Sequence, residues 1–238
     1  MSEWQAKRFW KEAAVTEAED GFGIALDGRP VRTPGRAALL VPTRAMAEAI
    51  AAEWDAQGEL LDPLSMPATR AANSAIEKVI PQRAGVIEAL AGYGATDLLC
   101  YRAEAPADLV ARQEAAWDPL LEWAREALGA PLKTTTGVMF APQDAGALAA
   151  LRAQLEGADA FELAALHDLI MLSGSLVIGL KARAPSDPGP LWEASRVDEI
   201  YQADAWGYDE EAVAAAAAKE EAFRAAHRFY QLAQGLAA

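Results

Sequence analysis

The sequence predicts an α+β protein, in which a small antiparallel strand-rich N-terminal domain precedes a mostly α-helical C-terminal domain. Short apolar runs separated by turn residues fill the first forty positions, which is typical of strands joined by hairpins. After residue 43, apolar residues recur at helical spacing between capping and stop residues. Two prolines in the segment 62–67 restrict the backbone, so we expect a strand-rich domain with one helix over residues 1–66 and an all-helical domain over residues 67–238.

The strongest local signal in the N-terminal region is the pair Asp27-Gly28. Both central residues of a two-residue hairpin turn must adopt a positive φ, and Asp-Gly tolerates this well, so both residues are expected to have a structural role. The expected strands cover residues 9–15, 22–26, 29–33 and 39–41.

A single helix should complete the N-terminal domain. Thr43 is a suitable capping residue, and the helix should end near Gly58. Met46, Ile50 and Trp54 recur at every fourth position and so share one face. We therefore expect Trp54 to pack in the core.

The rest of the chain reads as helix. The expected helices cover residues 69–80, 82–93, 107–128, 143–156, 159–172, 175–183, 191–206 and 209–234. Asp118-Pro119 resembles a helix start, which would split the third of these. The mostly apolar stretch 161–180 contains Glu162, His167 and Asp168, which would be costly in lipid, so a buried helix is expected there.

Composition excludes several classes of function. The net charge is −14, which disfavours nucleic acid and anionic membrane surfaces as partners. One cysteine and two histidines permit neither a disulfide within the chain nor a cysteine zinc cluster, so no metal site is expected. The N-terminus carries no signal-peptide pattern, and we expect a cytoplasmic protein without a signal or targeting peptide.

Catalytic motifs are weak. Cys100 with His167 could form a thiolate–imidazole pair, and Asp97 with Asp118 could act as paired carboxylates. Cys100 lies between apolar neighbours, which is more typical of a core cysteine. His167 and Asp168 are adjacent on the expected helix, so their side chains should point apart. A small hydrolase that uses Cys100 or a carboxylate pair stays open as an alternative.

The segment 195–207 shows two distinct faces when it is projected as a helix. Four residues fall on one polar stripe that ends in an aromatic ring: Ser195, Glu199, Gln202 and Trp206. Val197, Ile200 and Tyr201 fall on the opposite face. The polar stripe is either a solvated surface or a partner-binding surface, because tryptophan is a frequent anchor of protein interfaces.

An ordered set of motifs resembles the assembly chaperones of the catalytic sector of F-type ATP synthase. They are KRFW at 7–10, GFGIALDGRPVRTP at 21–34, EWDAQ at 53–57, DP at 62–63, MPAT at 66–69, TDLLCYRA at 96–103, and the segments 113–119 and 195–207. The order of the pieces, rather than any single one, makes the resemblance specific. Residues 208–211 and the alanine-rich tail depart from the family pattern.

The resemblance implies a non-enzymatic, cofactor-free chaperone. Such proteins bind the free alpha subunit of the synthase and prevent its aggregation until the beta subunit takes their place. It also implies the two-part fold expected above and, without a targeting segment, a bacterial cytoplasmic member that we expect to be a monomer. The candidate partner-binding residues are Ser195, Asp198, Glu199, Gln202 and Trp206, and Asp97 is a structural candidate. A generic interaction scaffold is a further alternative.

Overall fold

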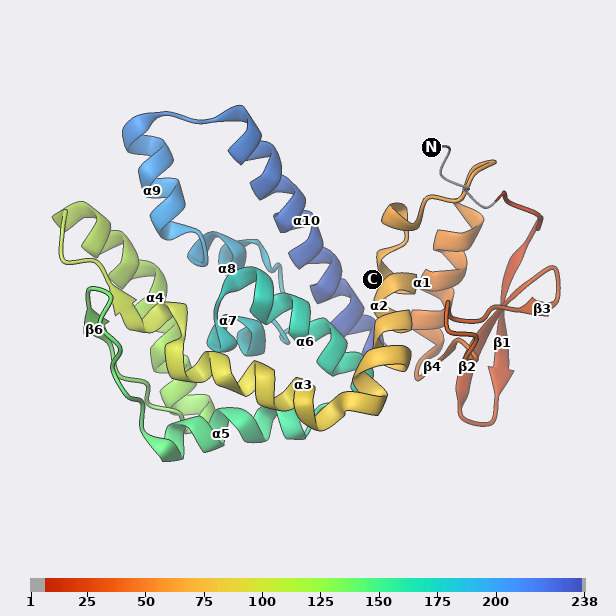
Figure 1. Ribbon diagram of the computed structural model, residues 1–238, viewed down its shortest axis with the longest axis horizontal. Coiled ribbons are helices and arrows are strands. Elements are labelled where there is room, and N and C mark those ends of the chain that lie inside the picture. The colour runs from red at the N-terminus through yellow and green to blue at the C-terminus, as the bar shows by residue number, and fades with distance from the viewer. Residues whose placement is uncertain (1–6, 237–238) are drawn as a thin grey trace. The chain divides into compact units, whose positions relative to one another are not determined.

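The computed structural model describes residues 7–236 (Figure 1). The first six residues, part of the N-terminus in which no signal-peptide pattern was found, lie outside the described residues. The chain forms two compact units. Unit 1 comprises Met1–Arg83, Ala160–Ala165 and Arg228–Ala238, and unit 2 comprises Ala84–Asp159 and Leu166–His227.

Unit 1 contains the antiparallel sheet that the sequence predicts. Its strands are β1 (Ala13–Ala18), β2 (Gly21–Leu26), β3 (Arg29–Pro30) and β4 (Leu40–Val41). β2 pairs with all three others, with Val15 opposite Ile24 and Gly23 opposite Leu40. The first strand begins four residues later than expected. Only the end of the expected segment pairs, because its register with β2 begins at Ala13 and Phe9 is exposed.

The hairpin at Asp27-Gly28 is confirmed. Asp27 has φ 45° and Gly28 has φ 78°, as a two-residue turn of this kind requires. The Asp27 carboxylate also accepts hydrogen bonds from the backbone N–H groups of Lys11 and Glu12, at 3.1 Å each. The same residue therefore shapes the turn and anchors the segment that leads into β1.

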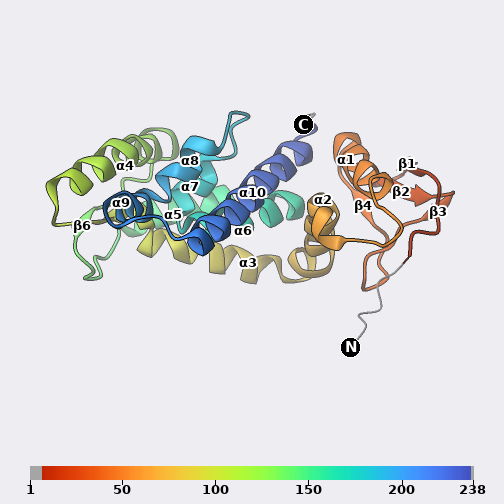
Figure 2. The same ribbon diagram turned by 90° about the horizontal axis from the view of Figure 1, so that it is seen from above.

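One helix, α1 (Arg44–Asp55), packs against β1 and β2 (Figure 2). Thr43 caps it as expected, with its Oγ1 accepting from the N–H of Met46 at 3.2 Å. Met46 and Ile50 are fully buried, and the ring of Trp54 meets Trp10 edge-on at 5.2 Å between centroids. Packing of this helix on the sheet forms the core of the strand-rich part.

The next two expected helices differ from the structure at their junction. Helix α2 (Pro67–Ser74) runs through a π-helical turn at Ala75–Val79 into α3 (Ile80–Gly92). Pro81 has no N–H to donate, and Gln82 departs from helical geometry with φ −122° and ψ 23°. The wide turn and the kink thus accommodate a proline without ending the helix.

Seven further helices follow in the described chain. They are α4 (Ala107–Leu128), α5 (Ala145–Glu156), α6 (Ala160–Ser173), α7 (Leu176–Lys181), α8 (Gly189–Ala194), α9 (Val197–Trp206) and α10 (Glu210–Ala233). A short parallel pair, β5 (Tyr101–Arg102) with β6 (Thr135–Thr136), also lies in unit 2, so residues 67–238 are not purely helical. Within residues 7–236, no helix is long and apolar enough to cross a membrane.

Two expectations about helix ends are wrong. α4 continues through Pro119, because Gln113, Trp117 and Leu120 form a buried stripe that carries the helix past the proline. Asp118 is therefore not a cap, and it pairs with Arg102 at 2.7 Å. The expected helix at 191–206 is broken into α8 and α9 at Ser195-Arg196.

Two glycines should respond oppositely to alanine. A Cβ at Gly21, where φ is +141°, would lie 2.5 Å from the carbonyl oxygen of Val41, whereas a Cβ at Gly85 in α3 meets nothing within 4 Å. We expect Gly21→Ala to lower the free energy of unfolding by about 2–4 kcal/mol. Gly85→Ala should raise it by about 0.5 kcal/mol. Urea denaturation followed by circular dichroism measures both, and equal effects would contradict this assignment.

Candidate functional site

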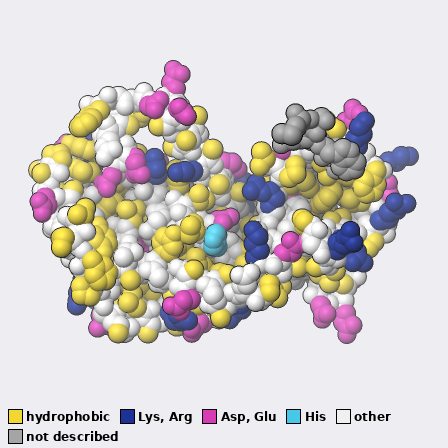
Figure 3. Space-filling model, in the orientation of Figure 1, with side chains coloured by type: hydrophobic (Ala, Val, Ile, Leu, Met, Phe, Trp, Pro, Cys, Tyr) yellow, Lys and Arg dark blue, Asp and Glu magenta, His cyan; other side chains and the backbone are white. Residues whose placement is uncertain are grey.

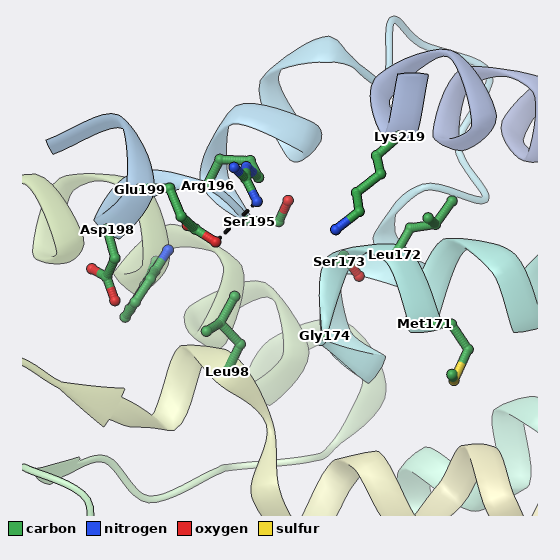
Figure 4. Close-up of a pocket in the computed structure, with 11 residues that line it drawn as sticks. Leu98, Met171, Leu172, Ser173, Gly174, Ser195, Arg196, Asp198, Glu199 and Lys219 are labelled. Carbon is green, nitrogen blue, oxygen red and sulfur yellow. Dashed lines mark hydrogen bonds and ion pairs between the residues drawn. The ribbon is translucent and has the colours of Figure 1, made fainter. Parts of the chain in front are cut away.

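A pocket of about 340 Å³ lies within unit 2, beside the start of α9 (Figure 4). Its walls come from the turn before β5, α4, the end of α6, the α8–α9 junction and α10. The lining residues are Leu98, Trp117, Met171, Leu172, Ser173, Gly174, Ser195, Arg196, Asp198, Glu199 and Lys219. The pocket thus combines apolar side chains with two acids and two bases.

Trp117 fixes one wall of the pocket. Its side chain is almost fully buried, and its indole N–H donates to the carbonyl of Ala194 at 2.7 Å. The guanidinium of Arg102 lies over the indole ring, 5.2 Å from its centroid. Because Ala194 is the last residue of α8, this contact holds the α8–α9 junction against α4.

The acidic wall is held by a buried amide. Gln113, on α4, donates from its Nε2 to Asp198 Oδ1 at 2.6 Å, and its Oε1 accepts from the N–H of Ala103 at 2.8 Å. Arg196 pairs with Glu199, three residues away on the same wall, at 2.9 Å, while Lys219 extends from α10 toward the pocket (Figure 4). Asp198 is therefore positioned by the core, and Glu199 is held by a half-exposed ion pair.

Asp97 stabilises the turn at Leu98–Cys100, of which Leu98 lines the pocket. It is fully buried and accepts hydrogen bonds from Ser175 Oγ at 2.7 Å and from the N–H groups of Val177 and Leu99 at 3.1 Å. Burial raises the pKa of Asp97 to about 6, although these hydrogen bonds act in the opposite direction. Its neighbour Leu98 donates to the carbonyl of Gly174 at 3.3 Å, so Asp97 ties together two segments that line the pocket.

Comparison with known proteins identifies the family. The family model of the ATP12 chaperone protein matches residues 7–125. The crystal structure of Atp12 from Paracoccus denitrificans is 50% identical, with a TM-score of 0.93, over 97% of this chain and 100% of that chain. This chain belongs to the ATP12 chaperone family. A putative chaperone from Agrobacterium tumefaciens is 39% identical, with a TM-score of 0.91, over 94% of this chain and 85% of that chain.

The candidate binding residues of this ATP12 family member occupy three different environments. Asp198 and Glu199 line the pocket on α9. Ser195 lines it too, but it precedes α9, is buried, and donates from its Oγ to the carbonyl of Trp192 at 2.6 Å. Gln202 and Trp206 lie farther along α9, away from the pocket, and are exposed. The expected single stripe is therefore broken by the helix break.

The expected apolar face of α9 is only partly buried. Val197 is in the core and Tyr201 is half-buried, but Ile200 is exposed. The reason is that α9 packs on α4 partly through polar contacts, in which Asp198 and Asp204 bind Gln113 and Arg112.

The possible catalytic residues are not assembled into one site. Asp97 is buried, whereas Asp118 is exposed and paired with Arg102. His167 Nδ1 lies 2.9 Å from Asp168 Oδ1, contrary to the expectation that these side chains point apart, and both are exposed. Within residues 7–236, no group of three or more His, Cys, Asp or Glu side chains could hold a metal ion.

Cys100 should be unreactive while the protein is folded. It is buried, and burial together with the nearby charge of Asp97 raises the pKa of its thiol to about 12. We expect a thiol reagent at neutral pH to modify Cys100 only as fast as the protein unfolds, with full reaction in denaturant. The rate is measured from the absorbance of the coloured thiolate that the reagent releases when it reacts with Cys100. Rapid modification of the folded protein would revive the hydrolase alternative.

Several residues of the site escaped sequence reasoning. Trp117 and Gln113 share one face of α4 at a spacing of four, which signals a common environment but not its purpose. The partners of Gln113 are 10 and 85 residues away in sequence, so its role could not be read locally. Lys219 lies in an alanine-rich segment with no recognisable motif.

Proposed function

We propose that this ATP12 family member is an assembly chaperone that binds the free alpha subunit of F-type ATP synthase. It prevents aggregation of that subunit until the beta subunit replaces it during assembly of the catalytic sector. Membership of a chaperone family, at 50% identity over nearly the whole chain, is the observation that carries the proposal. The ordered motifs that resemble these assembly chaperones supply the client.

An acidic protein with a pocket that combines apolar and charged side chains suits the role of an assembly chaperone. An orphan subunit exposes apolar surface and unpaired strand edges, and these drive aggregation. The chaperone covers that surface through α9, where Asp198 and Glu199 line the pocket and Gln202 and Trp206 extend the contact outward. Replacement by the beta subunit requires only that the beta subunit binds the client more tightly. The protein acts as a cytoplasmic monomer in a bacterium, without a cofactor and without catalysing a reaction.

Light scattering tests the proposed client. Purified alpha subunit is diluted from denaturant with and without an equimolar amount of the chain, and an unrelated aggregating protein is the control. We expect the chain to suppress scattering of the alpha subunit and to leave the control protein unaffected. Equal suppression of both proteins would indicate a generic scaffold, and no suppression of the alpha subunit would refute the proposed function.

A further inference from the structure

Three large apolar side chains are exposed along the end of α9, the connection that follows it and the start of α10. Trp206 is 90% exposed, Tyr208 is 67% exposed and Val213 is 48% exposed. They lie on the end of α9, its connection to α10 and the first turn of α10, all within unit 2 (Figure 1). An exposed tryptophan in a folded protein indicates a partner-binding surface more often than a single exposed aliphatic residue does. We call residues 197–218 the acidic arm.

The acidic arm is held firmly from its inner side. Arg112, on α4, pairs with Asp204 at 2.7 Å and also lies over the ring of Tyr201, 5.3 Å from its centroid. The hydroxyl of Tyr208 donates to Asp204 at 2.6 Å. These contacts fix the backbone on both sides of Trp206 and use none of its indole ring. The exposed ring is therefore presented by an ordered support, so little conformational entropy is lost when a partner covers it.

The charged side chains of the acidic arm are all acidic, and of these Glu199 and Asp204 are paired with arginines outside the arm. Its six acidic residues are Asp198, Glu199, Asp204, Asp209, Glu210 and Glu211, and the 22 residues include no lysine or arginine. Acidic side chains gather where the connection meets α10 (Figure 3). Asp209 has a local role, because its carboxylate accepts from the N–H of Glu211 at 3.1 Å. Glu210 and Glu211 are exposed, and they lie between Tyr208 and Val213 in the sequence.

We propose that the acidic arm binds a polypeptide segment in which large apolar side chains are flanked by arginine or lysine. The apolar side chains would cover Trp206, Tyr208 and Val213, and the flanking cations would face Glu210 and Glu211. Charge complementarity selects this occupant, since an apolar segment with acidic flanks would be repelled at the same surface. The inference rests on the proposed function, because it places that segment in the client subunit. It also adds residues 208–211, which lie outside the family resemblance, to the binding surface.

Two synthetic peptides test the chemistry of the partner without the client. They share one apolar core of leucine and phenylalanine, and they differ in carrying flanking arginines or flanking glutamates. Fluorescence anisotropy of the labelled peptides measures binding to the full chain. We expect the arginine peptide to bind about tenfold or more tightly than the glutamate peptide, and to weaken as salt is raised. Equal binding of the two peptides, or no binding of either, overturns the proposal.

Variants locate the binding on the acidic arm. Trp206→Ala should weaken the arginine peptide about tenfold or more. The double variant Glu210→Gln with Glu211→Gln, which keeps Asp209 in place, should remove most of the salt dependence. Val138→Ala is the matched control, because Val138 is 94% exposed on another loop of unit 2 and its loss should change nothing. Equal effects of Trp206→Ala and Val138→Ala would place the binding elsewhere and overturn the proposal.

The same proteins separate this inference from the proposed function. If wild type and Trp206→Ala hold the alpha subunit equally well, the function stands and the acidic arm is not its binding surface. If the arginine peptide binds as expected but the alpha subunit does not bind, the partner chemistry stands and the proposed client is wrong.

Discussion

Replacing Asp97 with alanine should lower the free energy of unfolding by about 3–5 kcal/mol, the largest stability effect expected in this protein. The change removes the acceptor for Ser175 Oγ and for the N–H groups of Leu99 and Val177, all of which are buried. Each buried donor left without a partner costs about 1–3 kcal/mol. Loss of the negative charge from the interior offsets part of this cost.

Urea denaturation followed by circular dichroism measures the effect. Glu122→Ala is the control, because Glu122 and its partner Arg125 are both half-exposed and their ion pair should contribute at most about 1 kcal/mol. If the two variants were equally stable, the hydrogen bonds of Asp97 would have no special role in the fold.

Asp97 should also make the stability of the protein depend on pH, and its raised pKa sets the direction of that dependence. Burial raises the pKa of Asp97 from 3.8 to about 6, so the folded protein holds this proton more tightly than the unfolded chain does. The stability that this proton contributes is fully present below pH 3.8 and is lost as pH rises through about 6. We therefore expect the unfolding free energy of the wild type, minus that of Asp97→Asn, to fall by about 3 kcal/mol as the pH rises over that interval. A difference that rises with pH would contradict a raised pKa.

Replacing Glu199 with alanine should weaken the complex with the alpha subunit by about 2–5 kcal/mol while leaving the fold intact. Glu199 lines the pocket, and its side chain is 50% exposed in the free protein, where Arg196 is its partner. A client that covers this carboxylate would depend on it, whereas an exposed ion pair adds little to folding. Loss of helical signal in the variant would instead assign Glu199 a structural role.

Glu122→Ala is a matched control for this substitution. Glu122 also pairs with an arginine three residues away on a helix, Arg125, and its side chain is 54% exposed. It does not line the pocket. Titration calorimetry with the alpha subunit should show wild-type affinity for Glu122→Ala and reduced affinity for Glu199→Ala. Equal affinities for the two variants would remove Glu199 from the binding surface.

Local signals predicted much of the fold. The sequence predicts a helix over residues 107–128, and α4 spans Ala107–Leu128, with Gly129 at φ 66° directly after it. The Asp27-Gly28 turn and the Thr43 cap were readable from sequence because each depends on the residue itself and its immediate neighbours. Errors arose where distant residues decide the outcome.

The helix break at Ser195-Arg196 is the clearest case. The segment holds no glycine or proline that would mark a break, and its helical pattern is continuous. The break is fixed by tertiary contacts instead: Trp117 binds the carbonyl of Ala194, and Gln113 binds Asp198. The pocket shares this origin, because it gathers residues from 98 to 219 that no local pattern connects.

Size-exclusion chromatography with light scattering, on a mixture of this chain and purified alpha subunit, tests the central claim most directly. We expect a soluble complex of the two proteins. Addition of the beta subunit should then release this chain as the alpha–beta assembly forms. Failure of the chain to co-elute with the alpha subunit, or retention of the chain in the alpha–beta assembly, would contradict a chaperone that occupies the client until its true partner arrives.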